Sequence, residues 1–271
     1  MNDAAADDEA VAAFYARGLE RDRLATGIGA LEFLRTQSLL EGYLPPPPAV
    51  VVDVGGGPGR YALWLAELGY TVHLVDPVPL HIEQARAAGG SLASITAGDA
   101  RNLDFPDESA DAVLMLGPLY HLTDRAARTG ALGEARRVCR AGGVVMATAI
   151  SRFASTLDGL RSGYLDDPTF AALAERDRRD GQHRNPSGDP AYFTTAYFHH
   201  PAELASEFAG AGLTHLATLA VEGPAWLFQD IDARLSGEKA RQILLTTLAS
   251  IENEPTMIDV NAHLLTIATQ Q

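Results

Sequence analysis

The chain has 271 residues, of which 46% are hydrophobic, and it carries a formal net charge of −14. This length and composition suit a globular protein with one sizeable domain and a small addition. Proteins that act on nucleic acids usually present a basic surface, so the acidic balance argues against a DNA or RNA partner. There is no uninterrupted apolar run of about 20 residues, so we expect no membrane span.

The N-terminus is acidic and rich in alanine, and it lacks the basic start and apolar core of a signal peptide. The chain has one cysteine, Cys139, which excludes an internal disulfide. Both features favour a cytoplasmic protein.

An N-terminal helical segment is expected before the first strand. Residues 10–42 have apolar side chains at roughly helical spacing, which Gly27 and Gly29 divide into two parts. The run Pro45–Pro48 cannot continue a helix, because proline lacks the backbone N–H and clashes with the preceding turn. The segment over residues 1–48 therefore ends at these prolines.

A buried strand, a glycine-rich turn and a helix follow the prolines directly. The run Val50–Val54 is typical of a parallel strand covered on both faces. The turn after it places free backbone N–H groups and the positive end of a helix dipole beside a ligand. A dinucleotide-binding turn would need G-x-G-x-x-G, but Arg60 stands where the third glycine belongs.

The pattern that fits is D-x-G-x-G-x-G, formed by Asp53, Gly55, Gly57 and Gly59. It resembles the first motif of the class I S-adenosylmethionine-dependent methyltransferases. The resemblance implies S-adenosylmethionine as the cofactor, with these four residues in its site. This ligand has no pyrophosphate but carries a sulfonium and an ammonium group, so an acid at the strand end is useful. A tight turn without a ligand is the alternative.

The resemblance also assigns the acids after the next two strands. Residues 71–76 form a second strand ending in Asp76, where a carboxylate can accept hydrogen bonds from the ribose hydroxyls of an adenosine-containing ligand. Residues 94–97 form a third strand, followed by Asp99 and Ala100. In the family, such an acid contacts the adenine amino group and the next backbone N–H contacts the ring. Surface or turn-forming aspartates are the alternative.

The end of the fourth strand faces both cofactor and acceptor in class I enzymes. Here the strand ends at Leu116 and the chain continues to Tyr120 and His121. The N/D-P-P-Y motif of the amino-adenine methylases is absent, so methylation of a nucleic-acid base is not supported. Histidine titrates near neutral pH, which makes His121 the leading candidate for a catalytic base. A structural histidine beside a loop is the alternative.

The chain is therefore divided into four parts. Residues 49–150 form the cofactor-binding core. In the family, helices before the first strand often cover the cofactor, so residues 1–48 are predicted to be a lid. Residues 151–200 hold many aromatic residues and histidines and are predicted to be a mainly helical cap over an acceptor pocket. Residues 201–271 return to the core sheet with a helical excursion.

The predicted acceptor pocket is lined by Tyr15 from the lid, Tyr120 from the core and His199 from the cap. No spacing of histidines, cysteines and carboxylates matches a metal site, so no metal is expected.

The alternation of strands and helices over residues 50–150 predicts a doubly wound, Rossmann-like α/β sheet. The resemblance supplies seven strands with the last antiparallel, and residues 213–221 and 263–269 would be the sixth and seventh. The connection between these two is longer than the usual hairpin. It would suit a second flank of the cap or an oligomer contact, so a homodimer is one expectation.

Three functions are consistent with these features. The first is a methyltransferase that acts on the oxygen or nitrogen of a small-molecule acceptor. The second is a cofactor-binding protein without transferase activity, and the third is a nucleic-acid or protein methyltransferase. The sequence does not name the acceptor.

Overall fold

The structure is a computed structural model in which residues 3–271 are described. The strands are β1 (Val50–Val54), β2 (Thr71–Asp76), β3 (Ser94–Ala97), β4 (Ala110–Met115), β5 (Cys139–Ser151), β6 (Gln182–His183), β7 (Ala196–His199), β8 (Thr214–Ala220) and β9 (His263–Thr269). The α-helices are α1 (Asp3–Tyr15), α2 (Glu20–Arg23), α3 (Gly27–Tyr43), α4 (Arg60–Glu67), α5 (Pro79–Ala88), α6 (Pro118–His121), α7 (Arg125–Val138), α8 (Ala154–Ser162), α9 (Pro168–Asp180), α10 (Pro201–Gly210), α11 (Ile231–Ser236) and α12 (Glu238–Ile251). Short 3₁₀ turns are η1 (Tyr164–Asp166), η2 (Pro190–Tyr192) and η3 (Gly223–Leu227).

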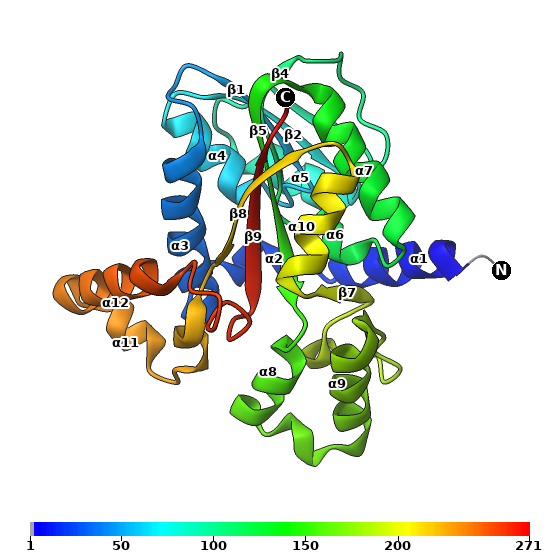
Figure 1. The fold of residues 1–271 in the computed structure, drawn as a ribbon, viewed down its shortest axis with the longest axis vertical. Helices are drawn as coiled ribbons and strands as arrows, with labels where there is room; N and C mark the ends of the chain where they lie inside the picture. The colour runs from blue at the N-terminus through cyan, green and yellow to red at the C-terminus, as the bar shows by residue number, and fades with distance from the viewer. Residues whose placement is uncertain (1–2) are drawn as a thin grey trace.

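One sheet runs through the centre of the molecule in the order β3-β2-β1-β4-β5-β9-β8 (Figure 1). Strand β9 is antiparallel to β5 and β8, and the other pairs are parallel. The predicted doubly wound sheet with an antiparallel last strand is thus confirmed. The order reverses between β1 and β4, and ligands of such folds bind at the carboxyl ends of the strands beside that reversal.

Alternate residues of each central strand pack on opposite faces of the sheet. On one face, Val52 and Val113 pack with helices α7 and α10. On the other face, Val51 and Leu114 pack with α3, α4 and α5. Because both faces are covered, the central strands are mainly apolar, as the valine run indicated.

The N-terminal segment differs in detail from the two helices expected. The first helix, α1, ends at Tyr15, and Gly18 with a φ of 74° separates it from the single turn α2. Helix α3 then begins at Gly27. This break brings α1 and α2 to the carboxyl ends of the strands, while α3 covers one face of the sheet.

Residues 151–200 project beyond the carboxyl end of β5 (Figure 1). They contain α8 and α9, as the helical expectation requires, and also the short strands β6 and β7. Strand β7 pairs with Ile150 and Ser151 at the very end of β5, which joins this segment to the central sheet.

The long connection between β8 and β9 packs on the N-terminal part of the chain. Ile231 of α11 and Leu244 and Leu248 of α12 form a separate small core with Leu31 of α3. Within residues 3–271, none of the helices combines the length and apolar character needed to cross a membrane.

Candidate functional site

The glycine turn lies at the carboxyl end of β1 and borders a cavity of about 380 Å³, called here the first cavity. Gly55 and Gly57 have φ values of 69° and 56°, a region that favours glycine. A Cβ on Gly56 would lie 2.6 Å from a carboxylate oxygen of Asp53. The turn therefore depends on glycine, and its bare backbone can approach a ligand closely.

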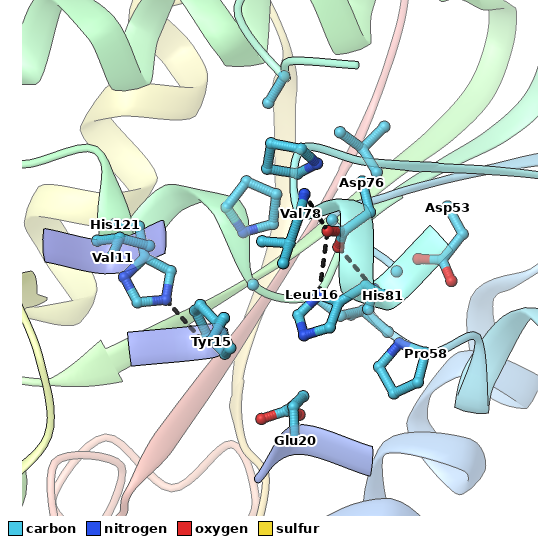
Figure 2. Close-up of a pocket in the computed structure, with 18 of the residues that line it drawn as sticks. Val11, Tyr15, Glu20, Asp53, Pro58, Asp76, Val78, His81, Leu116 and His121 are labelled. Carbon is cyan, nitrogen blue, oxygen red and sulfur yellow. Dashed lines mark hydrogen bonds and ion pairs between the residues drawn. The ribbon is translucent and has the colours of Figure 1, made fainter. Parts of the chain in front are cut away.

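Asp76, at the end of β2, holds this turn in place (Figure 2). Its carboxylate accepts hydrogen bonds from the backbone N–H of Gly57 at 2.8 Å and of Val78 at 2.8 Å, and from Nδ1 of His81 at 3.0 Å. The side chain lines the first cavity, where the sequence predicted a ribose contact. Asp76 also fixes the glycine turn, a role that the sequence did not indicate.

Asp53 is fully buried in the wall of the first cavity. Neither of its carboxylate oxygens has a hydrogen-bond partner among the described residues. Burial, and then the charge of Asp76, raise the pKa of Asp53 to about 7. An ionised carboxylate without a partner is costly to bury, so a cation bound in the first cavity would stabilise it.

The remaining predicted cofactor residues differ in whether they line the first cavity. Asp99, Ala100 and Leu116 line the first cavity. Gly59 does not line it. Its φ of 88° and its contacts make it the residue that lets α4 pack closely on the neighbouring β2 and α5.

The carboxylate of Asp99 is already engaged by a cation of the chain. Arg101 binds it at 2.5 Å and also binds Asp8 of α1 at 3.0 Å. Partial burial raises the pKa of Asp99, but the hydrogen bonds from Arg101 outweigh it and hold the pKa below its usual value. An adenine amino group would therefore share Asp99 with Arg101.

Tyr15 and His121 form a hydrogen-bonded pair at the edge of the first cavity (Figure 2). The Tyr15 hydroxyl lies 2.7 Å from Nε2 of His121, and Nδ1 lies 3.1 Å from the carbonyl oxygen of Thr195. A carbonyl only accepts, so Nδ1 carries the proton and Nε2 accepts from Tyr15. Burial lowers the pKa of His121 to about 4, so the ring is neutral at pH 7.

A second cavity of about 430 Å³ adjoins the first. The two share Tyr15, Glu20, Arg23 and Tyr120 in their walls. The wall of the second cavity is rich in aromatic residues, among them Tyr15, Tyr120, Tyr192, Phe193, Phe198 and Trp226, and it also holds Asp158 and His263. Its residues come from α1, from the segment 151–200 and from the connection after β8, which meet at the carboxyl end of β5.

The structure does not place His199 in either cavity, which corrects the prediction for this residue. Its side chain is fully buried, and Nε2 lies 3.3 Å from Glu207 of α10, which also binds Arg128 at 2.6 Å. The alternating directions of side chains along β7 explain the error, because Phe198 faces the cavity and its neighbour His199 faces the helices.

Several polar residues in the walls of the two cavities were not predicted from the sequence. His81 follows Asp76 by five positions on α5 and bonds to it. Glu20 of α2 and His263 of β9 also line the cavities. No local motif marks them, since each gains its place only from contacts between distant segments.

Comparisons with known proteins match the central part of the chain to a family. Residues 52–147 match the family model described as a methyltransferase domain. An uncharacterised methyltransferase of Mycobacterium tuberculosis (strain H37Rv) is 36% identical over 100 residues, which are 37% of this chain and 39% of that protein. A demethylmenaquinone methyltransferase of Roseiflexus castenholzii is 31% identical over 141 residues, covering 48% of this chain and 58% of that protein. The matches thus span less than two thirds of these relatives.

Solved structures extend the similarity of fold to most of the chain. A putative methyltransferase of Haloferax volcanii, solved in complex with the methyltransferase activator Trm112, has a TM-score of 0.61 at 19% identity. That comparison covers 96% of this chain and 97% of the other. Residues 52–147 thus match a methyltransferase domain, and most of the chain shares the fold of a methyltransferase structure, which confirms the resemblance recognised in the sequence.

The family and the fold imply S-adenosylmethionine as the cofactor, and the first cavity fits it. The partnerless carboxylate of Asp53 matches a cationic ligand, and the glycine turn leaves backbone N–H groups accessible. Asp76 and Asp99 provide oxygen acceptors for hydroxyl and amino groups.

Proposed function

We propose that this protein transfers the methyl group of S-adenosylmethionine to the oxygen or nitrogen of a small-molecule acceptor bound in the second cavity. The observation that supports it most is the shared wall of the two cavities. Tyr15, Glu20, Arg23 and Tyr120 border both, so a ligand in each would meet there. The second cavity, with aromatic side chains in its wall, suits a compact organic molecule better than a polymer.

In this proposal two parts of the chain outside the core border the cavities. Residues 1–48 are a lid, because Tyr15 and neighbouring residues of α1 close one side of the first cavity. Residues 151–200 are a cap, because Tyr192, Phe193 and Phe198 form part of the acceptor wall.

The chain's own residues mainly have to align the acceptor and exclude water. S-adenosylmethionine supplies, when bound, a methyl group that its sulfonium has already activated. Asp53 offsets positive charge in the first cavity. Tyr15 presents its hydroxyl at the shared wall and is held there by His121. A pKa of about 4 makes His121 a weak base, so we assign it the positioning of Tyr15 in place of the general-base role predicted from the sequence.

The test begins with calorimetric titration of S-adenosylmethionine into wild type, Asp53→Asn and Asp104→Asn. Asp104 is exposed and lies outside both cavities, so it is the matched control. We expect micromolar-range binding to wild type and control, near −8 kcal/mol. We expect Asp53→Asn to lose at least about tenfold in affinity, because a neutral amide no longer attracts the cation.

Asp53→Asn should also make the free protein more stable. The difference between a pKa of about 7 and the ordinary 3.8 corresponds to a cost of ionisation on the order of 4 kcal/mol at pH 8. Removing this charge should raise Tm by about 5 °C at pH 8. Lower stability together with lost binding would indicate misfolding and would contradict the role given to Asp53.

Transfer itself is measured as formation of S-adenosylhomocysteine with a panel of small phenols, carboxylic acids and amines. Absence of cofactor binding to wild type, after a check for ligand carried through purification, would overturn the proposal. Binding without product from any compound of the panel, but with product from RNA or a protein, would overturn the choice of a small-molecule acceptor.

A further inference from the structure

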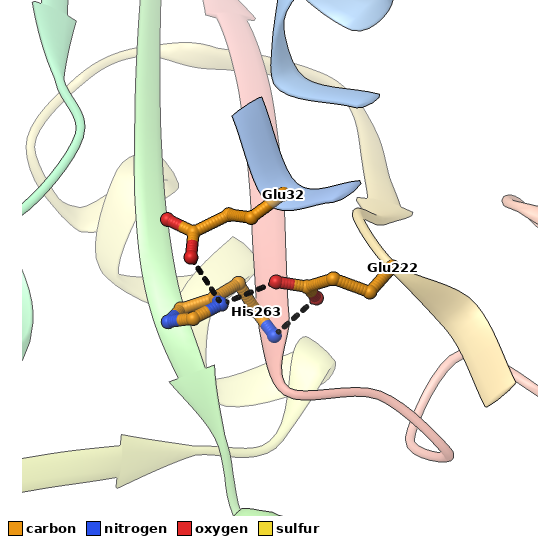
Figure 3. A group of neighbouring side chains, drawn as sticks. All are labelled: Glu32, Glu222 and His263. Atoms are coloured by element: carbon orange, nitrogen blue, oxygen red, sulfur yellow. Dashed lines mark hydrogen bonds and ion pairs between the residues drawn. The ribbon is translucent and has the colours of Figure 1, made fainter. Parts of the chain in front are cut away.

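Three ionisable side chains from distant segments meet where β9 begins (Figure 3). Glu32 of α3, Glu222 after β8 and His263 offer ligand atoms that all lie within 4.8 Å of one another. Nδ1 of His263 lies 2.6 Å from Glu222 and 3.9 Å from Glu32. His263 also lines the second cavity, so this cluster forms part of the proposed acceptor site.

The spacing would suit a metal ion, but the ligand atoms are already engaged by the chain. Arg23 binds the two oxygens of Glu32 at 2.5 and 3.0 Å, and its Nε binds Glu20 at 2.9 Å. Glu222 accepts hydrogen bonds from Nδ1 and from the backbone N–H of His263. Every carboxylate facing the cluster thus has a nitrogen donor, which favours an ion-pair network over a metal site.

The network fixes the direction of the His263 ring. Nδ1 carries a proton, because its partner is a carboxylate. The other ring nitrogen lies on the side of the ring away from Glu222 (Figure 3), and no hydrogen bond of the described residues involves it. Burial lowers the pKa of His263, but Glu222 and then Glu32 outweigh it and raise the pKa to about 9. At pH 7 the ring is therefore a cation with one N–H left to donate.

A second unused donor belongs to the same cavity. Trp226 lines it and is 5% exposed, and its indole N–H is buried without a partner among residues 3–271. A buried N–H that has no acceptor costs about 1–3 kcal/mol. Trp226 and His263 are thus two residues of this wall with a donor that no described residue accepts from.

We propose that His263 and Trp226 select an acceptor that is a flat aromatic compound carrying an anionic oxygen group such as a carboxylate. The imidazolium Nε2–H and the indole Nε1–H bind the oxygens, while Tyr120, Phe193 and Phe198 pack against the ring. This inference rests on the proposed function, because it assigns the substrate class of the same acceptor site.

An aromatic amine is the competing ligand, since ring faces attract cations. The hydrogen-bonding groups decide against it. Glu20 and Glu32 pair with Arg23, and Glu222 pairs with His263. Asp158, which lines the cavity, pairs with Arg161, so the groups still without a partner here are the donors of His263 and Trp226. A carboxylate supplies acceptors for them, whereas an ammonium group would face the positive His263.

The experiment measures binding of two probes of equal ring size to the protein saturated with S-adenosylhomocysteine. The probes are 2-naphthoate and 2-naphthylmethylamine, titrated calorimetrically at pH 7. We expect the naphthoate to bind at least about tenfold more tightly, because two donors, one of them charged, are satisfied. Its affinity should fall between pH 8 and pH 10, as His263 loses its proton among Glu222, Glu32, Arg23 and Glu20.

Two variants separate the donors, and each has a matched control. Trp226→Phe keeps an aromatic ring but removes the N–H, and His263→Gln removes the positive charge. Each should weaken naphthoate binding about fivefold or more and leave the amine within about twofold. Trp64→Phe and His215→Gln change the same residue types outside both cavities and should alter neither.

Equal affinities for the two probes, or a preference for the amine, would overturn the proposal. Failure of both probes to bind would overturn it as well, even though binding of S-adenosylhomocysteine would leave the proposed function standing. Losses in Trp226→Phe and His263→Gln no larger than in the controls would remove these two residues from recognition.

Discussion

Tyr15 and His121 are expected to act as one unit, because the Tyr15 hydroxyl and Nε2 of His121 are hydrogen-bonded at 2.7 Å. The Tyr15 hydroxyl donates to Nε2 of His121, and Thr195 fixes the tautomer from the other side of the ring. Burial raises the pKa of Tyr15 well above its usual value, so the phenol remains neutral and keeps its proton for this bond. The pair presents a neutral hydroxyl in a defined direction at the wall that the two cavities share.

We expect Tyr15→Phe and His121→Ala each to lower turnover about tenfold or more while leaving the affinity for S-adenosylmethionine within about threefold. The double variant should be little worse than either single one, because both changes remove the same interaction. Turnover is measured with whichever panel compound yields S-adenosylhomocysteine.

Tyr70→Phe is the control for this pair, since its hydroxyl bonds the distant Pro45 carbonyl. The pH profile gives an independent readout, because a pKa of about 4 for His121 predicts no break near 6.5 from this residue. Strictly additive losses in the double variant would show that the two side chains act separately.

At the scale of elements, α1 is attached to the rest of the molecule by few polar contacts. Asp7 accepts from the hydroxyl of Thr123 at 2.6 Å and from Arg184 at 2.9 Å. Asp8 pairs with Arg101 beside Asp99. These contacts join α1 to the core and to the segment 151–200, so they hold the helix over the first cavity.

If α1 is the lid, Asp7→Ala should loosen it. We expect the dissociation rate of S-adenosylmethionine to rise about tenfold, because a charged pair and a hydrogen bond to the closed position are lost. Stopped-flow competition measures this rate. Glu9→Ala changes an exposed acid of the same helix and is the control. An unchanged rate in Asp7→Ala would contradict a gating role for α1.

At the scale of the whole molecule, three buried groups set how stability depends on pH. For Glu207, burial raises the pKa, but His199 and Arg128 outweigh it and lower it to about 2, so its contribution is lost as pH falls from 4.5 through 2. His263, with a folded pKa of about 9, contributes fully below 6.5 and loses its contribution as pH rises through 9. Asp53 opposes folding increasingly as pH rises from 3.8 to about 7.

The free energy of unfolding should therefore be greatest near about pH 4 and fall toward both sides. The His263 contribution is on the order of 3 kcal/mol between pH 6 and pH 10. Urea unfolding across this range measures it. His263→Gln should flatten the alkaline side, with His215→Gln as the control, and an alkaline slope equal to that of wild type would refute the assignment.

The sheet and the cofactor end of the site could be read from local sequence patterns. The valine run, the glycines after it and Asp76 after the next strand are each defined within a few residues, because strands and turns depend on local backbone preferences. The parallel arrangement then brings the strand ends to one edge, so Asp53 and Asp76 meet without further information.

The acceptor end depends on contacts that local patterns do not encode. Tyr15 and His121 are separated by 106 positions, and Arg35 of α3 reaches Glu252 across 217. The cluster of Glu32, Glu222 and His263 likewise unites three segments. The side chain of His199 points toward α10 because β7 packs with one side toward the second cavity and the other side toward this helix.

The sequence by itself predicted the fold class and, through its resemblance to the methyltransferases, the cofactor, because a strand, a turn and an acid at its end are specified by neighbouring residues. Only the tertiary structure decided which polar groups face the acceptor and in which ionisation state. The position of a side chain in a cavity, and the charges around it, arise from packing between elements that are far apart in the chain.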